Sequence, residues 1–226
     1  MSDTALVIMA RYPEQGKIKT RLASHLGDNG TLQLYQAFLI DLAQRFAGWH
    51  YDLHWAYTPT DVDFDQCVAT LASLDASLWQ SFPQDGLELG TRLHHVFRTT
   101  DARRFENTIV IASDSPHLGR QVISQAREAL DSADLVLGPA EDGGYYLIAM
   151  REPYDVFSEI PMSTPAVLQM TIEKAQGLGL SVHLLKPLFD IDELADLARL
   201  VDILQRERAL APATAACLDH LIKELG

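Results

Sequence analysis

The feature that most constrains the fold is the alternation along the chain of short apolar runs and helical patterns. The runs are rich in β-branched residues and short enough for buried strands, while the segments between them repeat apolar residues every three or four positions. Strands are expected at Ala5–Met9, Leu53–Tyr57, Thr108–Ala112, Leu135–Leu137, Tyr145–Met150 and Val182–Leu185. Helix faces are expected at Tyr35–Phe46, Leu89–Phe97, Leu194–Leu204 and Val167–Ala175, the last following Thr164 as N-cap with Pro165 in its first turn. This order predicts an α/β fold with a mostly parallel central sheet and helices on both faces.

Size, charge and cysteine content narrow the class of protein. A chain of 226 residues has the length of one α/β domain, so we expect residues 1–226 to form a single domain. The formal net charge of −13 argues against a nucleic acid partner, because the long-range field repels polyanions. Cys67 and Cys217 lie far apart, and no apolar stretch approaches the length of a membrane span. We therefore expect a cytoplasmic protein without a membrane span, and the oligomeric state is left open.

In open parallel sheets, ligands bind at the carboxyl ends of the strands, so the loops after the strands are the places to search for chemistry. The segment 10–21 follows the first expected strand and carries four cations, Arg11, Lys17, Lys19 and Arg21, beside Gly16. Such a cluster can bind phosphate oxygens, with arginine as a planar fork and lysine as a point charge. It could also be a solvated loop whose cations balance nearby carboxylates. The glycine spacing of a P-loop or a dinucleotide fingerprint is missing.

A carboxylate ends the third expected strand. Asp114 follows the apolar run directly and would point into the crevice, where Mg²⁺ is usually held by one or two carboxylates together with substrate phosphates. Asp114 and Ser115 could instead cap a helix that begins at Pro116. In that helix His117 is expected at the surface and is not expected to be a ligand.

Two further loops carry acids. Gly143 and Gly144 permit a close approach to a ligand, and Glu141 and Asp142 before them could bind a metal or polar substrate groups. Asp142 could also close a hairpin, since Asp-Gly is a strong turn signal. Asp190 and Asp192 would lie on the same side of an extended segment, but acids at a helix start are expected from the helix dipole alone. Asp190 and Asp192 are candidate metal ligands only in combination with Asp114.

Taken together, these segments resemble a bacterial family of small GT-A-like transferases associated with radical-SAM and selenodomain proteins and named as glycosyltransferases in proposed arsenosugar pathways. More distantly, the layout is similar to that of the molybdenum-cofactor and phospholactate nucleotidyltransferases. The resemblance spans most of the chain and rests on segments 10–22, 84–92, 113–116, 138–146, 163–165 (Ser163-Thr164-Pro165) and 190–192. It implies a nucleotide-diphospho-sugar transferase-like, Rossmann-like fold.

The resemblance also implies roles for individual residues. Asp114 with Asp190 or Asp192 would hold Mg²⁺ or Mn²⁺, and Asp114, Asp142 and Lys19 would be the catalytic residues. The nucleotide and its phosphates would contact Arg11, Gly16, Lys17, Lys19, Arg21, Gln84, Gly86, Gly90 and Arg92. The acceptor side would be lined by Asp142, Gly143, Gly144 and Tyr145.

The family name favours a nucleotide-sugar donor and glycosyl transfer to a small acceptor. The dense basic cluster of the first loop suits a triphosphate and favours the alternative, nucleotidyl transfer to a phosphorylated small molecule. The sequence departs from the family patterns at two places, so both reactions stay open. The metal segment has Asp-Ser-Pro where glycosyltransferases usually have Asp-x-Asp, and the first loop lacks the glycine-rich spacing of sugar nucleotidyltransferases. A non-catalytic nucleotide-binding domain is the third alternative.

Overall fold

The computed structural model describes residues 2–162 and 164–225, so Ser163 of the motif 163–165 lies outside the described residues. The described strands form one seven-stranded sheet with the order β3-β2-β1-β4-β6-β5-β7. Only β6 runs antiparallel to its neighbours β4 and β5, and the other pairings are parallel. The strands are β1 (Thr4–Arg11), β2 (Asp52–Thr58), β3 (Gln80–Pro83), β4 (Asn107–Ala112), β5 (Leu135–Pro139), β6 (Tyr145–Met150) and β7 (Val182–Leu184).

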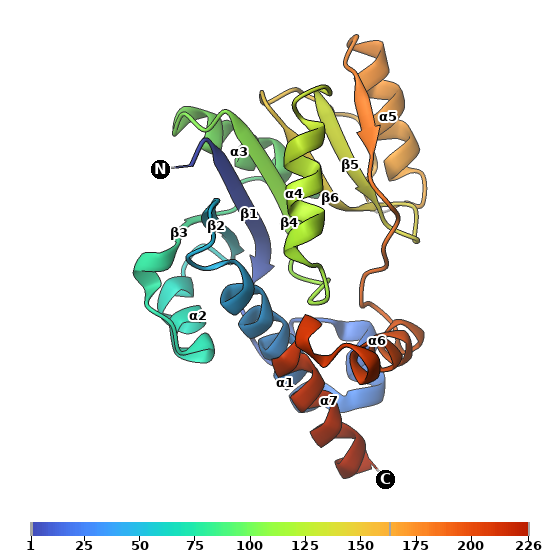
Figure 1. Ribbon diagram of the computed structural model, residues 1–226. Helices are drawn as coiled ribbons and strands as arrows, with labels where there is room; N and C mark the ends of the chain where they lie inside the picture. Colours follow the sequence, from blue (N-terminus) through green and yellow to red (C-terminus); the bar gives the residue numbers. More distant parts are fainter. Residues whose placement is uncertain (1, 163, 226) are drawn as a thin grey trace.

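Helices cover both faces of the sheet, as the alternating pattern predicted (Figure 1). The central strand β1 is buried on both faces: Leu6 and Ile8 belong to one core, and Ala5 and Val7 to the other. Helices α1, α2, α4, α6 and α7 pack against the first core, and α3 and α5 against the second. The helices are α1 (Thr20–Phe46), α2 (Phe64–Ala72), α3 (Leu89–Ala102), α4 (Arg120–Ala129), α5 (Val167–Gly177), α6 (Leu194–Arg206) and α7 (Pro212–Leu225), with short 3₁₀ turns at Ala76–Leu78 and Arg208–Leu210.

One local prediction about a helix start is wrong, and one alternative is excluded. Helix α5 begins at Val167 with Ala166 as its N-cap and no side-chain cap, so Pro165 lies before the helix and the Thr164 hydroxyl donates to the Pro161 carbonyl instead. Helix α4 begins at Arg120 and not at Pro116, so Asp114 and Ser115 do not cap it.

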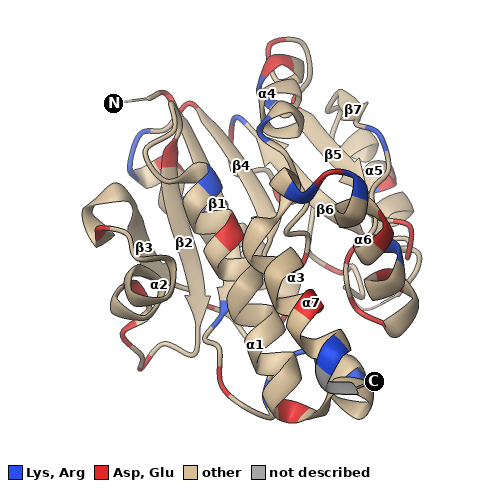
Figure 2. Cartoon of the chain, turned by 60° about the horizontal axis from the view of Figure 1, so that its bottom comes forward, with Lys and Arg blue, Asp and Glu red and all other residues tan. Residues whose placement is uncertain are grey.

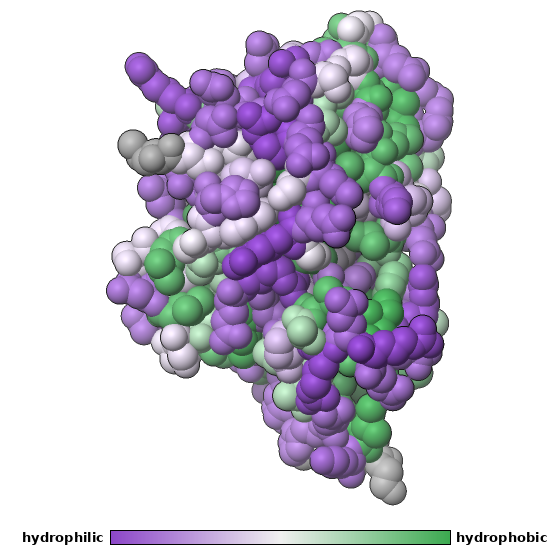
Figure 3. Space-filling view, viewed as in Figure 1, coloured by the Kyte–Doolittle hydropathy of each residue, from purple (hydrophilic) through white to green (hydrophobic). Residues whose placement is uncertain are grey.

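Acidic and basic residues are interspersed along the helices and loops (Figure 2). In the space-filling view, apolar areas appear on the side where α5 and β7 lie, and hydrophilic residues cover much of the remaining face (Figure 3). Among the described helices, none combines the length and the apolar composition needed to cross a membrane.

Candidate active site

The sheet topology brings the loop after β1 and the loop after β4 to the same edge. These strands are neighbours, and their register pairs Met9 with Ala112, so Arg11 and Asp114 leave the sheet side by side. A cavity of about 460 Å³ lies at this edge, lined by residues of β1, β4, β6, the start of α1 and the start of α3. The strand ends are therefore where the candidate site is found, as the rule for open parallel sheets predicts.

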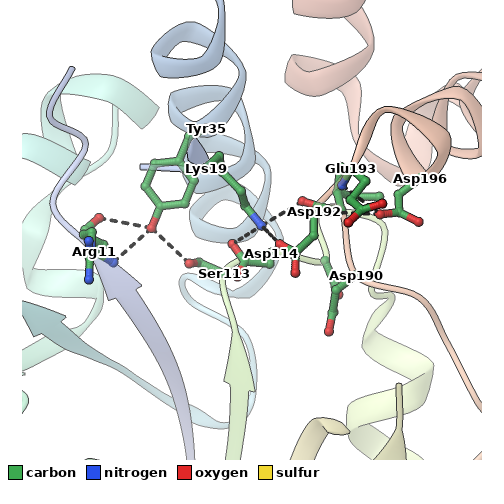
Figure 4. A network of polar contacts seen from close by, with 11 residues as sticks. Arg11, Lys19, Tyr35, Ser113, Asp114, Asp190, Asp192, Glu193 and Asp196 are labelled. Carbon is green, nitrogen blue, oxygen red and sulfur yellow. Dashed lines mark hydrogen bonds and ion pairs between the residues drawn. The ribbon is translucent and has the colours of Figure 1, made fainter. Parts of the chain in front are cut away.

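The Tyr35 hydroxyl ties these two strand ends to helix α1. It accepts a hydrogen bond from the Arg11 backbone N–H at 2.9 Å and lies 3.0 Å from both the Arg11 carbonyl and the Ser113 hydroxyl (Figure 4). Burial raises the pKa of Tyr35 to about 12, so the hydroxyl remains protonated and can donate. Tyr35 thus holds the backbone from which the basic loop and the Asp114 segment depart.

Lys19 pairs with carboxylates, as the second interpretation of the basic segment allowed, but it is buried and not solvated. Its ammonium lies 2.8 Å from Asp114 Oδ1 and 2.8 Å from Asp192 Oδ1, and it donates to the Ile191 carbonyl at 2.7 Å (Figure 4). Only 8% of the Lys19 side chain is exposed, against 36% for Asp114 and 46% for Asp192. Burial alone would lower the pKa of Lys19, but the two carboxylates outweigh it and the pKa is raised.

The Lys19 contacts show that Asp114 and Asp192 converge on one cation. Two carboxylates that share a cation, at the mouth of a cavity with room for phosphates, match the donor set that Mg²⁺ uses in nucleotide enzymes. Among the described residues, no three His, Cys, Asp or Glu side chains form a metal-binding cluster, so waters or phosphate oxygens would complete the coordination. The pair therefore fits a divalent ion that arrives with a substrate.

Asp190 points away from this pair, although it stands only two residues before Asp192 (Figure 4). Its carboxylate accepts a hydrogen bond from the Ser115 hydroxyl. Burial raises the pKa of Asp190 to about 6, partly opposed by the Ser115 hydrogen bond and reinforced by the negative charge of Asp114. The two acids of the segment thus have separate partners, and Asp192 is the one that lines the cavity.

The raised pKa of Asp190 predicts a pH-dependent effect of Asp190→Asn on stability, measured without divalent ions. Because the folded-state pKa of about 6 exceeds the reference value of 3.8, the native state binds the proton more tightly and loses stability as the pH rises from 3.8 to 6. The Asn variant, which carries no charge, should therefore be more stable than wild type by roughly 1 to 3 kcal/mol at pH 8, and by less at pH 5. Thermal unfolding at both pH values measures this, and a difference independent of pH would contradict it.

Six further predicted residues line the same cavity. Arg11 donates to the Lys17 carbonyl at 3.0 Å, and Lys17 pairs with exposed Glu14 at 2.9 Å. Arg21 lies 3.5 Å from Glu193, and both side chains are exposed. The Lys17 and Arg21 contacts are surface ion pairs of small energy, and Arg11 bonds only a neutral carbonyl, so the three cations are available to an incoming anion. The six are Arg11, Lys17, Arg21, Gln84, Arg92 and Tyr145.

Gln84 and Arg92 also have structural partners. The Gln84 side-chain amide donates to the carbonyls of Ala10 at 3.2 Å and Ala56 at 2.8 Å, which binds the ends of β1 and β2 together. Arg92 Nε donates to the Gly86 carbonyl at 2.9 Å and thereby fixes the loop before α3. Gly86 has a φ of +119°, and a Cβ there would lie 2.8 Å from the Thr91 side chain, so only glycine suits this turn.

The structure does not bring the remaining predicted residues to this cavity. Gly16 and Gly86 are turn residues outside its lining, and Gly90 lines a second cavity of about 530 Å³ between α3 and the segment 155–161. Their contact with a nucleotide stays a prediction.

The loop between β5 and β6 is a hairpin turn. Asp142 Oδ1 accepts the Gly144 N–H at 2.9 Å, and Glu141 forms a two-pronged ion pair with Arg199 at 2.8 and 2.9 Å. Gly143 has a φ of +92°, and a Cβ there would lie 2.0 Å from the Pro165 carbonyl oxygen. Asp142, Gly143 and Gly144 thus have the hairpin role that the sequence left open, and their catalytic or acceptor-binding role stays a prediction.

His117 contradicts the expectation of a helix-surface residue. Because α4 starts three residues later, His117 lies in a turn and is 8% exposed. Its ring packs on the Phe189 ring, with 4.7 Å between the two ring centroids. Burial, together with the charges of Arg45 and Arg199, lowers the pKa of His117 to about 4. This neutral contact packs the loop after β4 against the segment that carries Asp190 and Asp192.

Comparison with known structures defines the class of fold. The crystal structure of a putative nucleotide-diphospho-sugar transferase from Desulfovibrio desulfuricans shares 32% sequence identity and a TM-score of 0.89, over 99% of this chain and 98% of that chain. A 4-diphosphocytidyl-2C-methyl-D-erythritol synthase from Anaerococcus prevotii matches with 10% identity and a TM-score of 0.57, over 90% and 99% of the two chains. A nucleotidyl transferase from Methanothermobacter matches with 15% identity and a TM-score of 0.59, over 90% and 98%. The fold is that of nucleotide-diphospho-sugar transferases, as the sequence predicted, and the two distant matches show the fold alone.

The family follows from the sequence of the central region. Residues 42–164 match the family model described as "Uncharacterized protein conserved in bacteria (DUF2064)". The chain belongs to this family. No curated protein sequence matches it significantly.

Proposed function

We propose that the protein is a metal-dependent transferase that uses a nucleotide-sugar donor and passes the sugar to a small acceptor. The observation that carries this proposal is the composition of the cavity at the strand ends. Its lining contains two kinds of charged group: the converging carboxylates of Asp114 and Asp192, and the cations Arg11, Lys17 and Arg21. The similarity to a protein described as a putative nucleotide-diphospho-sugar transferase supports the same class of donor.

The chain's own residues would stabilise the charge of the leaving diphosphate. Arg11 and Arg21 offer planar guanidinium forks to phosphate oxygens, and Lys17 offers a point charge. Asp114 and Asp192 would hold Mg²⁺ or Mn²⁺, which would supply further neutralisation of the phosphates when bound. Preorganised charges of this kind act mainly on the charge that develops in the transition state.

Nucleotidyl transfer remains the second candidate, because three weakly paired cations from one loop suit the extra charge of a triphosphate. In that reaction pyrophosphate leaves and an acceptor oxygen attacks the α-phosphorus. A non-catalytic nucleotide-binding domain would need neither metal carboxylate.

Thermal unfolding with a panel of nucleotide sugars and nucleoside triphosphates, with and without Mg²⁺ or Mn²⁺, separates these candidates. A ligand at 100 times its Kd should stabilise the fold by about 2.7 kcal/mol. We expect metal-dependent stabilisation by a nucleotide sugar or its nucleoside diphosphate. Stabilisation by one triphosphate alone would make the protein a nucleotidyltransferase, metal-independent binding without turnover would favour the binding domain, and no shift with any nucleotide would contradict the proposal.

A further inference from the structure

The Lys19 ammonium already has a protein acceptor for each of its three N–H groups. The three close acceptors are Asp114 Oδ1 and Asp192 Oδ1, each at 2.8 Å, and the Ile191 carbonyl at 2.7 Å. In this arrangement Lys19 has no N–H left for a phosphate. The phosphate role expected from the sequence therefore requires the side chain to leave these partners.

The backbone of Lys19 is held in an uncommon conformation. It precedes α1 with φ 43° and ψ 47°, a left-handed geometry that residues other than glycine rarely adopt. Such a conformation persists where surrounding contacts determine it, and here those contacts are the two carboxylates and one carbonyl of the side chain.

A divalent ion and the Lys19 ammonium would compete for the same oxygens. An ion bridging Asp114 and Asp192 would lie against the ammonium, because Nζ already contacts one oxygen of each carboxylate. Like charges at such separations repel strongly in a partly buried site. With Lys19 in place, the two carboxylates and the ammonium together carry one net negative charge, whereas the two carboxylates alone would carry two. The attraction of the site for a second cation is therefore weaker.

A nucleotide would offer Lys19 new partners. Lys19 lines the cavity together with Arg11 and Arg21, so phosphate groups bound by these arginines would come within its surroundings. Lysine is suited to such an exchange because its charge sits on a flexible four-carbon stem.

We propose that Lys19 is a resident cation that occupies the metal position between Asp114 and Asp192 until nucleotide phosphates draw it away, so that the divalent ion binds with the nucleotide and not before it. This inference rests on the proposed function, because it takes the two carboxylates as metal ligands. It assigns Lys19 two successive partners, the carboxylates first and the phosphates second.

The test is the affinity for Mn²⁺ alone, measured by the electron paramagnetic resonance signal of the free ion. Without nucleotide, wild type should bind Mn²⁺ weakly, while Lys19→Met should bind it at least about tenfold more tightly, because the competing charge is gone. Adding Asp114→Asn to Lys19→Met should abolish the gain. Lys17→Met is the matched control: it removes the same charge from the same cavity, but Lys17 pairs with Glu14 and touches neither carboxylate.

Equal Mn²⁺ affinity of wild type and Lys19→Met would overturn the inference, as would tighter binding by wild type. A failure of this kind is separate from a failure of the proposed function, which is judged by metal-dependent nucleotide binding to wild type. Circular dichroism confirms that each variant is folded, and Lys19→Gln replaces the Met variant if that one does not fold. Nitrogen-15 NMR of the wild-type ammonium gives a second test: its protected signal should persist with Mg²⁺ alone, and loss of the signal on adding Mg²⁺ alone would also overturn the inference.

Discussion

Asp114→Asn should lower turnover of the donor by about 10²- to 10³-fold, the range found when one preorganised electrostatic group is removed from an active site. Asp114 follows β4 at the cavity and contacts the Lys19 ammonium at 2.8 Å. The amide has the same shape but no charge, so the attraction for a divalent ion is lost, while the Lys19 ammonium keeps only a neutral acceptor in this position. Steady-state kinetics with the donor selected by the unfolding panel measure the effect.

The fold should tolerate this change. Asp114 is 36% exposed, and the Lys19 ammonium, which is only 8% exposed, keeps Asp192 and the Ile191 carbonyl as partners, so the loss of stability should stay below that of an unpaired buried charge. Asp131→Asn is the matched control, because Asp131 is exposed on the surface and its ion pair within the described part of the chain is with Arg127. Turnover by Asp114→Asn at the wild-type level would refute the role assigned to the carboxylate.

The same substitution at Asp142 would decide between its two interpretations. Asp142 Oδ1 accepts the Gly144 N–H, and an Asn oxygen in the same place can accept it equally well. If Asp142 only closes the hairpin, turnover should therefore be preserved. If turnover falls as far as in Asp114→Asn, the catalytic role predicted from the sequence is supported.

The sequence predicts those elements of the fold whose apolar pattern is complete. Buried strands such as β1 and β4 read as continuous apolar runs because both of their faces are covered. Strand β3 was missed, because it is a four-residue strand at the edge of the sheet in which only Phe82 is buried, so neither a run nor an alternation is visible. Helices α2, α4 and α7 were also not predicted as helices from their periodicity.

The sequence locates the candidate site but not the pairing within it. The rule that ligands bind at the carboxyl ends of parallel strands points to the loops after the strands, but the strand order that makes β1 and β4 neighbours comes from the structure. The contact of Lys19 with Asp192 joins residues 173 positions apart, and no local pattern reveals it. Tyr35 was read only as part of a helix face, since periodicity indicates burial and says nothing about where its hydroxyl points. Asp190 and Asp192 could not be separated, because alternation places both on one side without naming their partners.

Asp41→Ala should have the largest effect on stability, roughly 3 kcal/mol. Asp41 of α1 is 2% exposed and caps the start of α7 from a distance of 172 positions in the chain. Its carboxylate accepts the backbone N–H of Ala213 and of Thr214 at 2.8 Å each, and the Thr214 hydroxyl at 2.6 Å. Alanine would leave these donors without a partner at a buried helix end, where unpaired N–H groups are costly.

Thermal unfolding measures this loss, which corresponds to a fall in Tm of about 6 to 12 °C for a chain of this length. Asp41→Asn keeps one acceptor oxygen and loses the charge, so its Tm should lie between those of wild type and Asp41→Ala. Asp219→Ala is the control on α7 itself: it breaks an exposed ion pair with Arg208, and such pairs contribute less than about 1 kcal/mol. Equal Tm values for Asp41→Ala and Asp219→Ala would show that the buried cap does not hold α7 against α1.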